Sequence, residues 1–521
     1  MSVEPPPTTA RFAPPALGES ALVFALAAAF TALVGALAVT QHAVNWRALA
    51  AVSHAVDVLG QDDTVNLALV GFVEPPLPTL LHLPLAWLMP NLASAGQTVW
   101  MFGAVVAGLT LLTANVACAD LGLRRPWRWV FCAAMLLNPV FLGMMATGAP
   151  DGLYVLLLLG GAWALLRWQR RGALRDLIAC SLFLGFALIT RYDAVAPVCV
   201  ATIVIATQVI AAREGWSKLE GTLITFLLPI VYLGGLWVLA NRLIMGEAWY
   251  FWRAAWAAET TLLGELTPVS GVLGAVLAFA PLLAAMWWAF WGGASGRPRL
   301  AGGAALMLAS PAGAMLAAPE WFRSWLTRAV GTDLPLQPAP DLLAPLLAAT
   351  LLLVPAMLGD LGPLFRRKTY AKEACLAGAG VLLALGCLGT LSSGMPVYLD
   401  PRPAFCGSLL GADDASATQT VAAQLRAEDP PGTLIVAGWP GYAVTLYAGR
   451  VKAKALFPHT SPPADVSKLG KPGGLLIRYE VSVLEARAAA RKWERALGRR
   501  LGPQPRYVGH GWAFYIPGEA P

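Results

Sequence analysis

Long apolar runs separated by short polar segments occupy most of the chain up to about residue 391. The first run, Ser20–Thr40, is long enough to cross a bilayer as a helix. Further apolar runs follow at roughly 97–118, 129–147, 152–167, 177–190, 194–212, 221–240, 268–291, 300–318, 341–358 and 374–391. The pattern predicts a polytopic α-helical membrane protein with about eleven transmembrane helices, of which the shorter ones tilt or are buried by neighbours.

The two ends of the chain differ from this middle part. Residues 1–19 are polar and rich in proline, which predicts a disordered N-terminal tail. The first span is longer than the apolar core of a secretory signal, and it therefore predicts an uncleaved anchor. The predicted domain organisation is a tail at 1–19, a transmembrane domain at 20–391 with an outer loop at 41–74, and a separate domain at 392–521.

The last part of the chain alternates between helical and strand patterns. Ser416–Glu428 and Leu484–Arg500 have helical spacing, whereas Thr433–Ala437, Leu475–Tyr479 and the aromatic stretch Tyr507–Ile516 read as strands. This alternation predicts a small α/β domain. No GxGxxG motif follows the first strand, so the sequence gives little support for a nucleotide site.

Composition and charge agree with a membrane protein. Hydrophobic residues make up 57% of the 521 residues, charged residues only 13%, and the net charge is +7. Within the predicted transmembrane domain, most of the basic residues lie in short loops between spans: Asp120–Arg128, Arg167–Asp176, Arg213–Glu220, Gly292–Arg299 and Gly359–Glu373. By the positive-inside rule these loops are cytoplasmic. The N-terminus is then cytoplasmic and the C-terminal domain periplasmic, in a bacterial inner membrane.

Several classes of function find no support in the sequence. We see no basic–aromatic patch or DNA-binding motif, so we expect no nucleic-acid partner. Six of the seven cysteines lie in apolar segments and none forms a CxxC pair. Five histidines are present without an HExxH motif, and this argues against a zinc enzyme.

The first outer loop concentrates acidic residues. The stretch His54–Pro84 contains Asp57, Asp62, Asp63 and Glu74 and has no lysine or arginine. Carboxylates beside a membrane are costly unless they face water, a cation or a substrate. The stretch Pro75–Leu92 follows, and its five prolines predict a broken or re-entrant segment rather than a regular spanning helix.

Other outer turns carry polar residues at the same predicted membrane face. They are Asn138, Asp151 and the sequence Arg191-Tyr192-Asp193. Because loops remote in sequence place ionisable groups on one side, we expect a shared polar pocket there. His82 lies in the proline-rich segment close by. Two roles are open for it: a contact to the substrate, or a structural histidine held by a hydrogen bond.

These residue types suit transfer of a sugar from a lipid phosphate. Arg191 can bind the phosphate through two parallel hydrogen bonds. Asp62 or Asp63 can remove the proton of the acceptor, while Glu74 can orient the acceptor, bind a metal or act as the base itself. Each of these residues can also have a purely structural role. Asp62-Asp63 can cap a helix, and Asp57 can be a solvated loop residue. Likewise, Asp151 can be an N-cap, and Arg191 and Asp193 can simply pair with each other.

One later outer loop, Asn241–Thr267, is rich in aromatic residues: Trp249, Tyr250, Phe251, Trp252 and Trp256. Such a loop is typical of an interfacial belt. The alternative is a lid over a lipid-linked substrate, with Arg253 or Glu259 reaching inward.

Four features together resemble the GT-C glycosyltransferases, most closely the bacterial relatives of protein O-mannosyltransferases and of the lipid A aminoarabinose transferase. They are the acidic loop after the first span, Glu74-Pro75-Pro76-Leu77, the pair Asn138-Pro139 before Gly148-Ala149-Pro150-Asp151, and Leu188-Ile189-Thr190-Arg191-Tyr192-Asp193-Ala194. The match covers roughly residues 20–210; the later parts match in architecture alone.

The resemblance implies an inverting transfer of a hexosyl or pentosyl group from a polyprenyl-phosphate-linked sugar to a lipid, glycan or protein acceptor, at the periplasmic face. It implies that an acidic residue of the first outer loop, by position Asp62 or Asp63, is catalytic. Many relatives have an Asp-Glu pair further from Pro-Pro, and Asp57 is closer to that spacing. Some relatives bind a divalent cation such as Mg²⁺ or Mn²⁺ and others do not.

Two other classes of function remain as alternatives. A transporter or flippase for a lipid-linked saccharide predicts inverted repeats and ionisable residues near the bilayer midplane, and the sequence has no convincing internal repeat. A non-catalytic assembly subunit would use the C-terminal domain as its binding part.

Overall fold

The computed structural model describes residues 15–40, 43–59, 75–94, 96–251, 302–310, 340–361, 413–414, 416–428, 433–437, 441–449, 454–457, 472–479, 482–497, 501–502 and 504–516. Five helical segments in these ranges are long and apolar enough to cross a membrane: Leu17–Thr40, Thr98–Asp120, Pro150–Arg171, Tyr192–Ala211 and Trp216–Met245. The chain is therefore a multi-pass membrane protein. The predicted spans at 268–291 and 374–391 lie outside the described residues, so the number of eleven stays a prediction.

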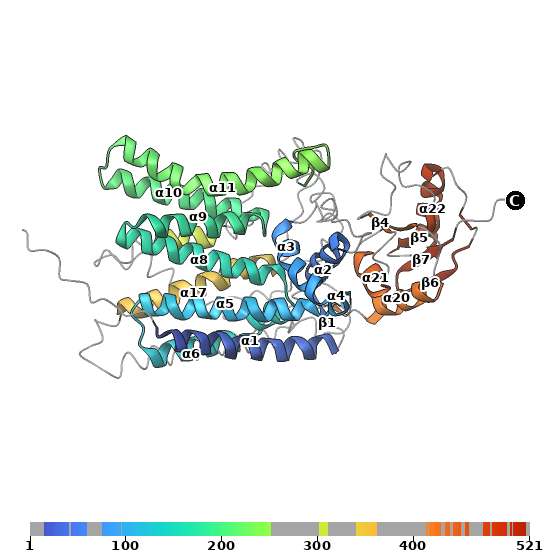
Figure 1. The fold of residues 1–521 in the computed structure, drawn as a ribbon, viewed down its shortest axis with the longest axis horizontal. Helices are drawn as coiled ribbons and strands as arrows, with labels where there is room; N and C mark the ends of the chain where they lie inside the picture. The colour runs from blue at the N-terminus through green and yellow to red at the C-terminus, as the bar shows by residue number, and fades with distance from the viewer. Residues whose placement is uncertain are drawn as a thin grey trace, which may run out of the picture.

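The long helices lie side by side in a bundle (Figure 1). Helix α1 (Leu17–Thr40) packs along α5 (Thr98–Asp120), and α8 (Pro150–Arg171) lies between α5, α9 (Leu174–Leu188) and α17 (Pro340–Leu361). The outer pair is α10 (Val195–Ala211) and α11 (Trp216–Ile244). Helix α8 is the central one, because 89% of its spanning window is buried against 17% for α11. We infer that the apolar side chains exposed on α11 face lipid.

The predicted span at 129–147 is wrong as a single helix. The structure has α6 (Arg125–Leu136) and α7 (Pro139–Ala146), which are separated at Leu137 and Asn138. Pro139 has no amide hydrogen to continue α6 and disfavours the helical conformation for the residue before it. The Asn138 side chain then begins the new helix, since its Oδ1 accepts a hydrogen bond from the Phe141 backbone N–H at 3.2 Å.

Three shorter helices cover one end of the bundle: α2 (Trp46–Leu59), α3 (Pro76–Leu88) and α4 (Pro90–Ser94). The predicted break in the proline-rich segment is confirmed at Met89. Pro76 and Pro78 do not prevent α3, because the amide hydrogens of a first turn have no partner within the helix. We call this end of the bundle, on which α2 and α3 lie, the α3 end.

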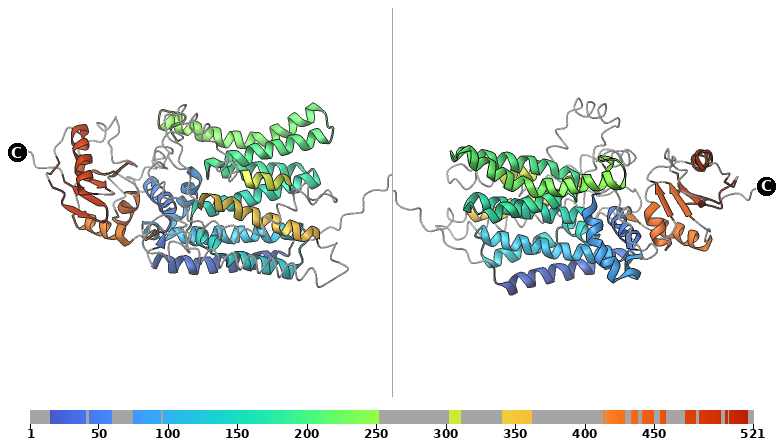
Figure 2. Two further views of the ribbon diagram at one scale, coloured as in Figure 1. Left: turned by 180° about the vertical axis from the view of Figure 1, so that it is seen from behind. Right: turned by 45° about the horizontal axis from the view of Figure 1, so that its top comes forward.

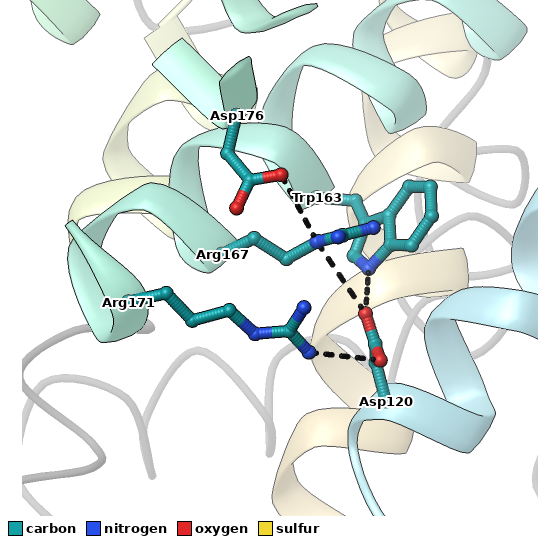
Figure 3. Close-up of polar contacts among 5 residues, drawn as sticks. All are labelled: Asp120, Trp163, Arg167, Arg171 and Asp176. Atoms are coloured by element: carbon teal, nitrogen blue, oxygen red, sulfur yellow. Dashed lines mark hydrogen bonds and ion pairs between the residues drawn. The ribbon is translucent and has the colours of Figure 1, made fainter. Parts of the chain in front are cut away.

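The opposite end of the bundle is held by ion pairs (Figure 3). Asp120 at the end of α5 accepts hydrogen bonds from Trp163 Nε1 at 3.1 Å and Arg171 Nη2 at 3.2 Å. Arg167 Nε lies 3.7 Å from Asp120 Oδ2 and 3.3 Å from Asp176 Oδ1. The predicted basic loop Arg167–Asp176 is thus mostly helical, since α8 continues to Arg171 and α9 begins at Leu174.

A five-stranded mixed sheet follows in the last part of the chain, in the order β4-β3-β5-β7-β6. Its strands are β3 (Thr433–Ala437), β4 (Lys454–Phe457), β5 (Pro472–Arg478), β6 (Tyr507–Gly509) and β7 (Trp512–Tyr515). Strand β3 is parallel to β4 and β5, whereas β7 is antiparallel to β5 and β6. The strands predicted at Thr433–Ala437 and around Leu475 are confirmed. The stretch Tyr507–Ile516 is not one strand but a hairpin, which turns at His510 and Gly511.

Helices cover both faces of this sheet. Helices α20 (Ser416–Glu428) and α21 (Gly441–Tyr447) pack on one face, against Leu434, Val436 and Phe514. Helix α22 (Val483–Leu497) packs on the other, against Ile435, Ile477 and Tyr515. The alternation follows from the two-residue period of strands.

The sheet lies at the α3 end of the bundle, as both views in Figure 2 show. Tyr442, Ala443 and Leu446 of α21 pack into one apolar cluster with Leu49 and other residues of α2. The short strands β1 (Ala43–Val44) and β2 (Asp413–Asp414) also pair antiparallel. The C-terminal sheet is therefore docked on the segment that follows the first span.

Candidate functional site

Two of the sequence motifs meet at the α3 end. The backbone N–H of Leu77, in the Pro-Pro-Leu motif, donates to the Ile189 carbonyl at 3.0 Å. Ile189 directly precedes the turn that contains Arg191. Helix α3 therefore starts against the turn between α9 and α10, although the two segments are more than a hundred residues apart in sequence.

Arg191 is the centre of a buried ionic cluster in this turn. Its backbone is extended, with φ −151° and ψ 133°, just before the 3-10 helix η2 (Tyr192–Ala194). Arg191 Nε donates to Asp193 Oδ1 at 3.0 Å and Nη2 donates to Asp193 Oδ2 at 2.9 Å, which is a two-point pairing. Arg191 Nη1 also pairs with Asp151 Oδ1. We call Arg191, Asp151, Asp193 and Tyr154 the Arg191 cluster.

Asp151 comes to this cluster from the first turn of α8. It follows Pro150 at the first helical position, and the N-cap is Ala149, which makes no side-chain cap hydrogen bond. The reading of Asp151 as an N-cap is therefore wrong, because its carboxylate instead faces Arg191.

Tyr154 is a member of the cluster that the sequence reading missed. The Arg191 guanidinium carbon lies 4.9 Å from the centre of the Tyr154 ring, and Tyr154 is fully buried. A cation over an aromatic face is stabilised by the ring quadrupole. One signal was available in the sequence, since Asp151 and Tyr154 are three residues apart and share a helix face.

Two carboxylates contact the one guanidinium of this cluster. The side chains of Arg191 and Asp151 are only 9% and 2% exposed. The proposed phosphate-binding role of Arg191 stays a prediction. A phosphate bound there would meet an arginine that already holds two carboxylates.

An aromatic group covers the other side of the turn. Trp237 Nε1 of α11 donates to the Tyr192 hydroxyl at 3.2 Å, and the Phe251 ring lies 5.0 Å from the Tyr192 ring. The Phe251 backbone N–H donates to Asn241 Oδ1 at 3.2 Å. The chain after α11 thus folds back over Tyr192. Trp252, Arg253, Trp256 and Glu259 lie outside the described residues.

His82 is buried inside α3 near the same end. Its Nδ1 is 2.8 Å from the Pro78 carbonyl, and its ring centre is 4.5 Å from that of Phe102. This is the hydrogen-bonded arrangement that the structural reading predicted. Helix α3 is not one of the spanning helices. Burial lowers the pKa of His82 to about 4. His82 is therefore neutral at pH 7, and its substrate-contacting role stays a prediction.

The acidic residues of the first outer loop are only partly described. Asp57 lies within α2 and is 3% exposed, so the reading of it as a solvated loop residue is wrong. Asp62, Asp63 and Glu74 lie outside the described residues. Among the residues that the structure describes, no group of three or more histidine, cysteine, aspartate or glutamate side chains is placed to hold a metal ion.

Comparisons with known proteins found a distant likeness to solved structures. No protein-family model and no curated protein match the chain. The chain is similar to a solved structure, the archaeal oligosaccharyltransferase AglB from Archaeoglobus fulgidus in complex with an inhibitory peptide and a dolichol-phosphate, with 10% identity and a TM-score of 0.48. The similarity covers 92% of this chain and 72% of that chain. A likeness at this level does not identify a function.

Proposed function

We propose that the chain is a membrane glycosyltransferase of the GT-C type. It transfers a sugar from a polyprenyl-phosphate-linked donor to a lipid, glycan or protein acceptor. The observation that carries the proposal is the Leu77–Ile189 hydrogen bond, because it brings the start of α3 against the Arg191 turn at one end of the bundle. In the proposal, the acidic loop that precedes Pro75 in the sequence lies at this same end. Such convergence is what a catalytic pocket at a membrane surface needs.

The α3 end is the outer face in this proposal. The other end carries Arg124, Arg125, Arg171 and Arg175, which are exposed, and the positive-inside rule assigns such residues to the cytoplasm. The C-terminal sheet then lies in the outer aqueous compartment, because it docks on α2 at the α3 end.

The reaction requires one general base. A carboxylate of the first loop removes the proton from the acceptor hydroxyl or amine while the acceptor oxygen or nitrogen bonds to the anomeric carbon. The bond from that carbon to the phosphate oxygen breaks, and its electron pair leaves with the polyprenyl phosphate. Attack opposite the leaving group inverts the anomeric configuration. The candidates for the base are Asp57, Asp62, Asp63 and Glu74.

The Arg191 cluster has a positioning role in this scheme. Its ion pair with Asp151 fixes the start of α8 relative to the turn before α10. The aromatic group of Tyr192, Trp237 and Phe251 lies directly beside it and packs this turn against α11. Asn138 fixes the start of α7 and His82 the interior of α3, while Asp193 holds the guanidinium.

Turnover with a defined donor tests the proposal. The full-length protein in lipid nanodiscs is incubated with a radiolabelled polyprenyl-phosphate sugar and envelope lipid, and the release of polyprenyl phosphate is followed. We expect release with the lipid-linked donor and none with the matching nucleotide sugar. Turnover of the nucleotide sugar alone, or movement of the intact donor across the bilayer without release, would contradict a transferase of this class.

A further inference from the structure

We propose that the outer face of α22 binds an anionic glycan in the aqueous compartment that the C-terminal sheet occupies. The basis is a row of basic side chains on that helix. Arg487, Arg491 and Arg495 recur every four residues, and Lys492 lies next to them. All four are exposed.

The row points away from the membrane bundle. Ala486, Ala490 and Trp493 are the buried side of α22 and pack on the sheet. The opposite face of the sheet is covered by α20 and α21, and α21 is the helix that packs on α2. The sheet therefore separates α22 from the bundle, as Figure 1 shows. The basic row therefore does not face the bilayer that surrounds the bundle.

The row is costly for the helix itself. Arg487 and Arg491, and again Arg491 and Arg495, are like-charge pairs one turn apart, each of which destabilises a helix by about 0.2–0.5 kcal/mol. The helix dipole favours Arg495 in the last turn, but it does not account for Arg487 near the beginning. The nearby Glu494 is engaged elsewhere, because its Oε1 accepts the Leu501 backbone N–H at 2.8 Å. A bound polyanion would offset this repulsion.

The shape of the face favours an extended polymer over a folded protein. Successive arginines lie about 5–6 Å apart along a convex helix surface, as one helical turn dictates. Leu484, which is 74% exposed, lies one turn before Arg487. Protein interfaces usually have an aromatic, desolvated centre, whereas a linear row of cations suits a chain with a charge on each residue, such as a uronate or phosphate-bearing glycan.

Binding to a defined polyanion tests this inference without requiring turnover. The full-length protein in neutral-lipid nanodiscs is titrated with alginate oligosaccharides, with neutral dextran of the same length as the control ligand. We expect binding to alginate that weakens as salt shortens the screening length. The triple variant R487Q/R491Q/R495Q should bind about 10-fold or more weakly, and the charge-preserving R487K/R491K/R495K should keep most of the affinity.

The outcomes separate the alternatives. Equal binding by the wild type and the glutamine variant would overturn the inference, and so would binding to polyglutamate without binding to alginate. If the triple variant fails to fold, the single variant R491Q replaces it and should lose about 2–5-fold. Because no sugar donor is present, failure here leaves the transferase proposal standing, and absence of turnover leaves this inference standing.

Discussion

Arg191 and Asp151 form an ion pair across 40 residues of sequence. The pair joins the turn before α10 to the first turn of the central helix α8, and Asp193 completes the coordination of the same guanidinium. Both partners are buried, so removal of one leaves a buried charge with less compensation.

Removal of the guanidinium should destabilise the fold. In Arg191→Gln, the buried Asp151 carboxylate and the partly buried Asp193 carboxylate lose the guanidinium. We expect a loss of about 3–5 kcal/mol with a clearly lower thermal midpoint. Arg191→Lys keeps the charge but not the planar two-point pairing with Asp193, and should fall in between. Thermal unfolding in micelles measures both. A glutamine variant as stable as the wild type would contradict the role of the pair.

Gly148 should tolerate alanine worse than Gly172, although both have φ of +64°. An added Cβ at Gly148 would lie 2.8 Å from Val99 Cγ1, whereas nothing lies within 4 Å at Gly172. Gly172→Ala should therefore cost only the backbone strain of about 1–2 kcal/mol. Gly148→Ala should cost about 1–3 kcal/mol more for overpacking. Equal thermal midpoints for the two variants would contradict the close approach of α5 to the turn before α8.

Because His82 is buried, the protein should lose stability in mild acid. Burial lowers the pKa of His82 to about 4 in the folded protein, against 6.5 for a histidine in the unfolded chain. Between these two values only the unfolded chain takes up the proton, so stability falls as the pH drops from about 6.5 to 4. From pH 7 to 5 the loss should be about 2 kcal/mol. His82→Gln should lack this component, and identical pH profiles of unfolding for the two proteins would refute the assignment.

Leu446 should couple the C-terminal sheet to α2. Its side chain is 1% exposed in the cluster with Leu49 of α2, and Leu446→Ala should cost about 2–5 kcal/mol of packing. We expect faster hydrogen–deuterium exchange in α2, which carries Asp57. Val444 on the same helix faces the sheet instead, so Val444→Ala is the matched control and should leave α2 unchanged. Faster exchange in α2 for both variants, or for neither, would exclude a specific contact.

Local patterns predicted the elements better than their meeting points. The apolar runs gave α1, α5, α8, α10 and α11 because each is continuous and long enough to span. The break at Asn138 was readable from Pro139 but was missed, since the apolar run continues through it. Asp57 was misread because hydrophilicity alone does not distinguish a loop residue from a buried helical one.

The candidate site depends on contacts that periodicity cannot supply. Sequence reasoning placed Asp151 and Arg191 on one face of the membrane, yet their pairing depends on how α8 and α9 pack. Trp237 approaches Tyr192 from 45 residues away in sequence, and nothing in the pattern of α11 distinguishes it from other apolar positions. Tyr154 is the exception, because it lies one helical turn from Asp151.

Single substitution of the four first-loop carboxylates tests the central claim most directly. Transfer from a polyprenyl-phosphate sugar is measured for Asp57→Asn, Asp62→Asn, Asp63→Asn and Glu74→Gln, each checked for an unchanged thermal midpoint. We expect one variant to lose about 10²–10⁴-fold in turnover, as the loss of a general base requires. Full turnover in all four folded variants would contradict a base in this loop and with it the proposed mechanism.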